Sequence, residues 1–133
     1  MSKPEFAACD FGAESGRVIL GSLDQGKLRM KELHRFRNPQ VRAMGHYHWD
    51  LLHLFQELKN GLSRAASKGH KELSGIGVDT WGVDFGLLDR EDKLLGNPVC
   101  YRDPRTEGVM EEVFELVPAS EIYQLTEIGR AHV

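Results

Sequence analysis

The 133-residue sequence lacks several features that would point to a particular class of protein. It has two cysteines, Cys9 and Cys100, which is too few for a disulfide framework, and neither stands in a spacing typical of a zinc site. We therefore expect a reducing environment. Lys and Arg number 17 against 20 for Asp and Glu, so the net charge is -3. No basic excess is available to neutralise a nucleic-acid backbone, which disfavours nucleic acid as a partner.

Long apolar runs are also missing. None approaches the ~20 residues that span a bilayer, and the first five residues lack the apolar core of a secretion signal. We therefore expect a cytoplasmic protein with no membrane partner. What is present is an ordinary globular composition, 41% hydrophobic and 28% charged, in a length that fits one domain or part of one.

The order of apolar and turn-forming residues predicts an α/β domain built on a mixed sheet. Three strands joined by glycine-containing turns come first, then a helix, then further strands and a second helix. The segment 41–48 is polar and is expected to be irregular. The predicted strands cover residues 5–10, 17–23, 27–37, 73–78, 83–88 and 99–101, and the second predicted helix covers residues 106–116.

The first predicted helix has clear start and stop signals. Asp50 is a good N-cap, and Gly69 is a plausible C-terminal stop. Apolar residues recur between them at helical spacing and are expected to belong to the core, not to a surface that binds a partner. They are Leu51, Leu54, Phe55, Leu58 and Leu62.

The first predicted hairpin has a turn that can bind phosphate. Asp10 ends a strand, and the glycines Gly12 and Gly16 allow backbone N–H groups to approach an anion closely. Asp10 can hold a magnesium ion through water, and Arg17 adds a positive charge. The alternative is a plain hairpin turn with a capping aspartate, which is favoured on spacing alone because short glycine motifs often occur without a phosphate site.

A second segment, residues 77–85, suits a small polar ligand. Trp81 offers a flat apolar wall, Gly82 permits close backbone approach, and carboxylates can accept hydrogen bonds from hydroxyl groups. The alternative is a hairpin with a packed tryptophan, in which Asp84 faces water. We expect the strands that end at Asp10 and Asp79 to stand side by side, so that their loops open into one shared hollow.

A third segment, residues 101–106, leads into the second predicted helix. Asp103 followed by Pro104 is a typical helix start, so a capping role for Asp103 outweighs a catalytic one. Tyr101 and Arg102 precede the cap, where a loop can present them to a ligand. Elsewhere, the pair His46-x-His48 has no third ligand at useful spacing, which favours a solvated loop over a metal site.

Taken together and in this order, the three segments resemble the N-terminal part of a sugar kinase of the FGGY family. The resemblance runs from about Ala7 to Leu125 and is most specific in residues 77–85. Members of this family have the actin-like, ribonuclease-H-like ATPase fold. The resemblance therefore implies an incomplete domain of that fold, with a mixed sheet and flanking helices.

The resemblance also implies site residues and cofactors, here ATP with Mg²⁺. Glu14 departs from the family pattern, in which a small or hydroxyl residue is expected, because a carboxylate near phosphates is repulsive unless it points away or joins the magnesium shell. The ATP phosphates are implied to lie against Ala13, Glu14, Ser15, Gly16 and Arg17, and the sugar against Gly82. To these we add Asp10 for magnesium and Trp81, Tyr101 and Arg102 as residues of the sugar pocket.

The activity implied is transfer of the ATP γ-phosphate to the 1-hydroxyl of L-rhamnulose, a step of rhamnose breakdown. The alternatives are an FGGY kinase for xylulose, fuculose or glycerol, or a non-catalytic domain that binds nucleotide or sugar. Family members are several times longer, and their general base is expected beyond Val133. We therefore expect no catalytic residue in this chain and no kinase activity from the chain alone.

The resemblance fades after Leu125. Residues 1–126 are expected to form the N-terminal part of the first kinase domain. Residues 127–133 resemble the translation of a sequencing-library adapter, so we expect a non-native tail in which Arg130 and His132 have no function.

Overall fold

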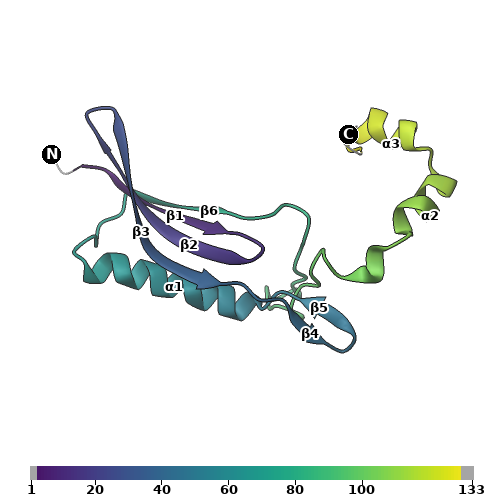
Figure 1. Cartoon of the computed structure of the whole chain (residues 1–133), viewed down its shortest axis with the longest axis horizontal. Helices are drawn as coiled ribbons and strands as arrows, with labels where there is room; N and C mark the ends of the chain where they lie inside the picture. Colours follow the sequence, from purple (N-terminus) through teal and green to yellow (C-terminus); the bar gives the residue numbers. More distant parts are fainter. Residues whose placement is uncertain (1–2, 130–133) are drawn as a thin grey trace. The chain divides into compact units, whose positions relative to one another are not determined.

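The computed structural model describes residues 3–129, and the chain divides into two compact units. The sheet unit is Met1–Tyr101, and the helical unit is Arg102–Val133. The main sheet of the sheet unit has four strands in the order β3-β2-β1-β6 (Figure 1). Its strands are β1 (Glu5–Phe11), β2 (Ser15–Asp24), β3 (Lys27–Arg37) and β6 (Gly75–Asp79).

The main sheet is mixed, as the sequence predicts. β1, β2 and β3 pair antiparallel, whereas β6 pairs parallel to β1. The turn between β2 and β3 has positive φ at both central residues, 50° at Gln25 and 76° at Gly26, which matches the right-handed twist of the strands that it joins. The three predicted N-terminal strands are therefore confirmed.

Helix α1 (Leu51–Ser67) packs against β2 and β3 on one face of the sheet (Figure 1). Its predicted N-cap is confirmed, because the Asp50 side chain accepts a hydrogen bond of 3.0 Å from the His53 backbone N–H. Gly69, with φ of +95°, follows the helix end at Ser67. The expected core face is only partly buried, since Leu54 is 6% exposed but Phe55 is 57% exposed.

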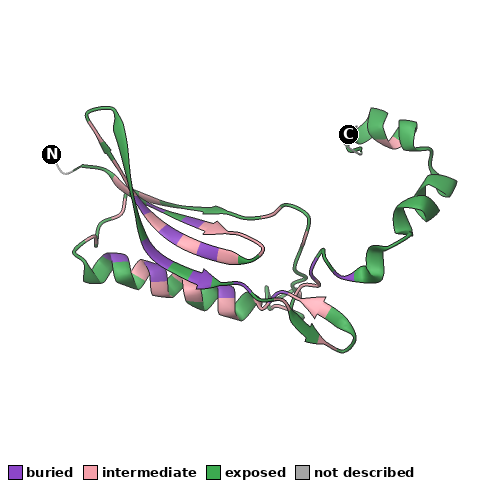
Figure 2. Cartoon of the chain, viewed as in Figure 1, coloured by how far each residue is buried: buried purple, intermediate pink, exposed green. Residues whose placement is uncertain are grey.

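Buried residues concentrate on the part of the sheet that α1 covers (Figure 2). Both cysteines are buried as thiols, and burial raises the pKa of the Cys9 thiol. Strand β3 departs from strict alternation, because the register shift opposite Val18 and Ile19 lets Leu33 and His34 both face inward. The buried hydrophobic residues are Ala7, Cys9, Val18, Leu20, Leu33, Phe36, Trp49, Leu54, Ala65 and Cys100.

The segment 41–48 is a hairpin, so the expectation of irregular structure is wrong. β4 (Val41–Ala43) pairs antiparallel with β5 (His46–His48). The two residues between them have positive φ, 49° at Met44 and 87° at Gly45, the same turn geometry as between β2 and β3. Gly45 indicates a hairpin turn, but the polar composition of the segment favoured a prediction of irregular structure.

The predicted strand 83–88 does not form. The segment bonds locally, with the Leu95 N–H donating to the Leu87 carbonyl and the Asp89 N–H donating to the Lys93 carbonyl. Among the described residues, the segment pairs as β structure through one isolated antiparallel bridge, between Leu88 and Leu94. An apolar run without a neighbouring strand to pair with does not become part of a sheet.

The helical unit begins with a 3-10 helix at Pro104–Thr106, capped as predicted by the Asp103 side chain, which accepts from the Arg105 N–H at 3.1 Å. The predicted single helix 106–116 is wrong, because Gly108, with φ of +81°, separates this turn from α2 (Val109–Leu116). Helix α3 (Ala119–Thr126), which was not predicted, follows.

Of the expected tail, residues 130–133 lie outside the described residues. Within residues 3–129, none of the helices combines the length and the apolar character needed to cross a bilayer.

The contact between α1 and β2 depends on Gly61. A Cβ added there would lie 2.3 Å from a Val18 methyl carbon. Replacing a helical glycine by alanine normally gains about 1 kcal/mol, but overpacking costs roughly 1–3 kcal/mol. We therefore expect Gly61→Ala to lower the free energy of unfolding in urea by up to about 2 kcal/mol. In a Val18→Ala background, where there is room for the added methyl, the cost should disappear. An equal cost in both backgrounds would contradict this account.

Candidate functional site

The strands that end at Asp10 and Asp79 lie side by side, as predicted. β1 and β6 are parallel, and their register places Asp10 opposite Asp79 at the same edge of the sheet. The register continues across the sheet, with Arg17 on β2 opposite Asp10 and Arg35 on β3 opposite Arg17. Paired residues share a face, so these four side chains form a charged row on the face opposite α1. We call Asp79, Asp10, Arg17 and Arg35 the charged row.

Two ion pairs order this row. Arg17 Nε donates to Asp10 Oδ2 at 2.8 Å, and Arg17 Nη2 forms an ion pair with the same oxygen at 2.8 Å. Arg35 makes a two-pronged contact with Glu32, at 3.2 Å from Nε to Oε1 and 2.6 Å from Nη2 to Oε2. The hydrogen bond and charge of Arg35 hold the pKa of Glu32 below its ordinary value, and Glu32 in turn raises the pKa of Arg35. The Arg35 guanidinium therefore remains positive beside the turn.

A pocket of about 390 Å³ lies between the charged row and the β1–β2 turn. It brings together Asp10 and four of the five predicted phosphate residues. Arg35, which the sequence analysis did not assign, also borders it. The lining residues are Asp10, Gly12, Ala13, Glu14, Ser15, Arg17 and Arg35.

The two glycines of the β1–β2 turn have packing reasons to be glycine. A Cβ on Gly16 would lie 2.2 Å from the ring of Phe36, and a Cβ on Gly12 would lie 2.8 Å from the Ser15 carbonyl oxygen. Gly12 also donates its N–H to that carbonyl at 3.0 Å. Gly16 itself is buried and does not line the pocket. The plain hairpin is thus compatible with the glycine spacing, and phosphate binding by the turn remains a prediction.

Asn38 holds the turn from the end of β3, a role that the sequence analysis missed. Its side-chain Nδ2 donates to the Gly12 carbonyl at 3.0 Å, and its backbone N–H donates to the Glu14 carbonyl at 2.9 Å. Only 3% of Asn38 is exposed. The sequence shows Asn38 next to Pro39 as a strand end, but no local signal indicates a partner 26 residues away.

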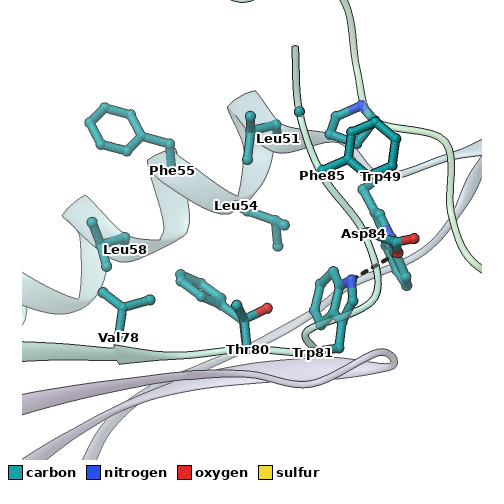
Figure 3. Close-up of a pocket in the computed structure, with 13 residues that line it drawn as sticks. Trp49, Leu51, Leu54, Phe55, Leu58, Val78, Thr80, Trp81, Asp84 and Phe85 are labelled. Atoms are coloured by element: carbon teal, nitrogen blue, oxygen red, sulfur yellow. Dashed lines mark hydrogen bonds between the residues drawn. The ribbon is translucent and has the colours of Figure 1, made fainter. Parts of the chain in front are cut away.

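The second predicted segment is arranged around Asp84, which does not simply face water. Asp84 Oδ2 accepts from Trp49 Nε1 at 2.5 Å, from Trp81 Nε1 at 2.9 Å and from the Tyr101 backbone N–H at 3.1 Å. The rings of Trp49 and Trp81 have their centroids 4.4 Å apart. Figure 3 shows the Trp81 indole pointing toward the Asp84 carboxylate.

A second pocket, of about 370 Å³ and mostly apolar, lies on the α1 face between that helix and the end of β6 (Figure 3). Asp10 and Phe11 are consecutive on β1 and point to opposite faces, so the two pockets share no lining residue. The two pockets are separate in the described part of the chain, and the single shared hollow stays a prediction. The lining residues are Phe11, Trp49, Leu51, Leu54, Phe55, Leu58, Val78, Thr80, Trp81, Asp84, Phe85, Gly86 and Pro98.

The remaining predicted sugar residues are spread more widely. Gly82 is exposed, lines neither pocket, and has no atom within 4 Å of a Cβ built on it. Tyr101 is 40% exposed, with its ring centroid 6.2 Å from that of Trp49. Arg102 belongs to the helical unit. The structure therefore groups Trp81 and Tyr101 around Asp84, whereas the roles of Gly82 and Arg102 remain predictions.

Substitution of Asn38 tests whether it supports the turn. Asn38→Ala removes the donor and leaves the Gly12 carbonyl without this partner, so we expect the free energy of unfolding to fall by roughly 1–3 kcal/mol. Asn38→Asp keeps the shape but places an acceptor against the same carbonyl, so it should be at least as destabilising. Urea titrations would measure both. An Asp variant as stable as the parent would contradict the proposed hydrogen bond.

Comparison with known proteins identifies the family. Residues 6–132 match the profile of the FGGY family of carbohydrate kinases, N-terminal domain. The chain is 46% identical to a rhamnulokinase of Oceanobacillus iheyensis over 121 residues, covering 91% of the chain and 26% of that protein. It is 44% identical to a rhamnulokinase of Bacteroides thetaiotaomicron over 126 residues, covering 95% and 26%. The chain thus spans about a quarter of the length of these curated relatives.

Solved structures agree on the fold. A gluconate kinase from Lactobacillus acidophilus superposes with a TM-score of 0.75 at 17% identity, covering 92% of this chain and 25% of that one. A xylulose kinase from the same organism gives a TM-score of 0.72 at 17% identity, covering 91% and 24%. These likenesses confirm the expected actin-like fold. The chain belongs to the FGGY family of carbohydrate kinases and matches its N-terminal domain.

Proposed function

We propose that this chain is the N-terminal part of an ATP-dependent kinase that phosphorylates the 1-hydroxyl of L-rhamnulose. The observation that carries the proposal is the charged row, which stands beside a glycine-containing turn where β1 and β6 end together. The resemblance of residues 77–85 and the names of the curated relatives support L-rhamnulose as the sugar.

The β1–β2 turn is proposed to bind the ATP phosphates. Phosphoryl transfer depends on positioning both substrates and on neutralising charge. Arg17 and Arg35 supply two positive charges at the pocket, and the backbone N–H groups of the turn add dipoles. The proposed phosphate residues are those of the resemblance: Ala13, Glu14, Ser15, Gly16 and Arg17.

Magnesium is proposed to bind beside the carboxylates of the charged row. Asp10 and Asp79 are neighbours on parallel strands, and hard oxygen ligands of this kind suit Mg²⁺, which keeps much of its water and binds substrate phosphate. When bound, the ion would offset the negative charge of the phosphates. Asp10 is proposed as the principal ligand, and Arg17, which is paired with it, holds its carboxylate in place.

The sugar is proposed to bind near Trp81, Gly82, Tyr101 and Arg102. The exposed backbone at Gly82 allows close approach, and the Trp81 ring supplies an apolar wall. The general base is proposed to lie outside this chain, which spans a quarter of its relatives. We further propose a cytoplasmic enzyme, with residues 1–126 as the native domain segment and residues 127–133 as a non-native tail that the source DNA would reveal.

A chimera tests the proposal with the residues of this chain. Residues 1–126 would replace the matching N-terminal quarter of the Oceanobacillus iheyensis rhamnulokinase. In a coupled ADP-release assay we expect the chimera to phosphorylate L-rhamnulose in preference to xylulose, fuculose and glycerol. We expect the 133-residue chain alone to give no turnover above the blank. Turnover by the chain alone, or a preference for another sugar, would refute the corresponding part of the proposal.

Substitution of Arg17 in the chimera tests the phosphate role. Hydrogen bonds to charged groups contribute about 1.5–3 kcal/mol, so Arg17→Gln should lower kcat/KM for ATP roughly 10- to 100-fold while KM for the sugar changes little. Arg29→Gln is the matched control, because Arg29 is an exposed arginine on β3 outside the charged row. Equal kinetics for the two variants would exclude Arg17 from the phosphate site.

A further inference from the structure

Both tryptophans of the sequence donate to the same carboxylate oxygen, an arrangement that the proposed function does not use. Trp49 Nε1 lies 2.5 Å and Trp81 Nε1 lies 2.9 Å from Asp84 Oδ2. The backbone N–H of Tyr101 donates to that oxygen at 3.1 Å. Three donors therefore converge on one atom, from positions 35, 3 and 17 residues away in the sequence.

The three donors come from separate parts of the sheet unit. Trp49 directly precedes the cap of α1, Trp81 lies just beyond the end of β6, and Tyr101 ends the unit. Asp84 is thus the point that ties the start of α1 to the loop after β6. Without this carboxylate, the described hydrogen bonds give no other acceptor to either indole.

The bond to Trp49 is explained by burial alone. Trp49 is 1% exposed, and a buried indole N–H requires an acceptor wherever it lies. Trp81 is only partly buried, and its ring lines the apolar pocket, so water could serve as its acceptor. The Tyr101 side chain is 40% exposed. The bonds to these two residues fix the direction of groups that are partly exposed to solvent.

Asp84 Oδ2 is not available for a ligand. A carboxylate oxygen offers about two lone-pair sites, and three N–H donors already converge on this one. Through Oδ2, Asp84 therefore acts on the groups that it holds. A ketose presents C–H faces as well as hydroxyl groups, and an aromatic ring held at a fixed angle is a suitable wall for the C–H face.

We propose that Asp84 is a positioning residue for the sugar: its Oδ2 fixes the Trp81 indole and the Tyr101 backbone as one wall of the sugar site. This inference rests on the proposed function, because the sugar is the ligand of that wall. It assigns to Asp84 a larger effect on sugar binding than on nucleotide binding, since Asp84 does not line the pocket proposed for the phosphates.

The first test uses the 133-residue chain, in which the two tryptophans are also the spectroscopic probes. We expect Asp84→Ala to shift the tryptophan emission to longer wavelength and to remove at least about half of the near-UV circular dichroism of the two neighbouring indoles. Asp84→Asn retains a carbonyl acceptor and should keep most of the signal. Far-UV circular dichroism would establish that each variant is folded. If Asp84→Ala does not fold, Asp84→Ser replaces it, because the serine side chain is shorter than that of aspartate.

Asp89→Ala is the matched control. Asp89 also accepts two hydrogen bonds through one carboxylate oxygen, from the Glu91 and Lys93 N–H groups at 2.8 and 2.9 Å, but contacts neither tryptophan in the described bonds. It should leave the tryptophan spectra unchanged. Spectra of the Asp84 variants that match those of Asp89→Ala would overturn the proposal, because Asp84 would then not hold the indoles.

The second test separates positioning from stability, using the chimera with the O. iheyensis rhamnulokinase. Asp84→Ala should raise KM for L-rhamnulose roughly tenfold and leave KM for ATP within about twofold, with partial recovery in Asp84→Asn. Equal changes in both KM values, or a lower melting temperature with unchanged KM values, would overturn the positioning role. A parent chimera that phosphorylates no sugar would instead overturn the proposed function, and with it the assignment of a sugar to this wall, whatever the tryptophan spectra show.

Discussion

The parallel pairing of β1 with β6 is the constraint on which the site depends. The facing of the β1 side chains is fixed by burial, because Ala7 and Cys9 face α1 and are each only 1% exposed. A slip of one residue would turn every side chain of the strand to the other face, burying Asp10 under the helix and exposing Cys9. The hydrophobic core therefore decides where the charge lies. Alternate residues of these strands face the core, and the residues between them form the charged row.

The β1–β2 turn shows why a motif cannot by itself separate function from packing. Gly16 must be small because the Phe36 ring lies against it, and Gly12 because the Ser15 carbonyl does. Asn38 then fastens the turn through two hydrogen bonds. These contacts would be needed in a turn with no ligand at all. What favours a phosphate site is the neighbourhood of the turn, where two arginines and two aspartates share one face.

Turn residues, helix caps and apolar periodicity predicted the strands and the helix that depend on them. Glycine turns defined the first three strands, and Asp50 with its apolar periodicity defined α1. The apolar run 83–88 satisfied the same rules but found no partner strand, and the polar run 41–48 formed a hairpin through Met44 and Gly45. Side-by-side placement of Asp10 and Asp79 could be expected from two strands with similar ends. The partners of Asn38 and Asp84 could not, because hydrogen bonds across 26 and 35 residues leave no local pattern.

Asp10 and Asp84 illustrate the remaining difference between sequence and site. Asp10, with its side chain 37% exposed, shares its carboxylate with one arginine on the open face, where an incoming cation or phosphate can compete for either partner. Asp84 has its Oδ2 occupied by neutral N–H donors that belong to its own fold. The first arrangement can exchange partners and the second cannot. The two aspartates thus suit different tasks: Asp10 suits binding of a ligand, and Asp84 suits holding its own neighbours in place. The hydrogen-bond donors around each carboxylate distinguish the two.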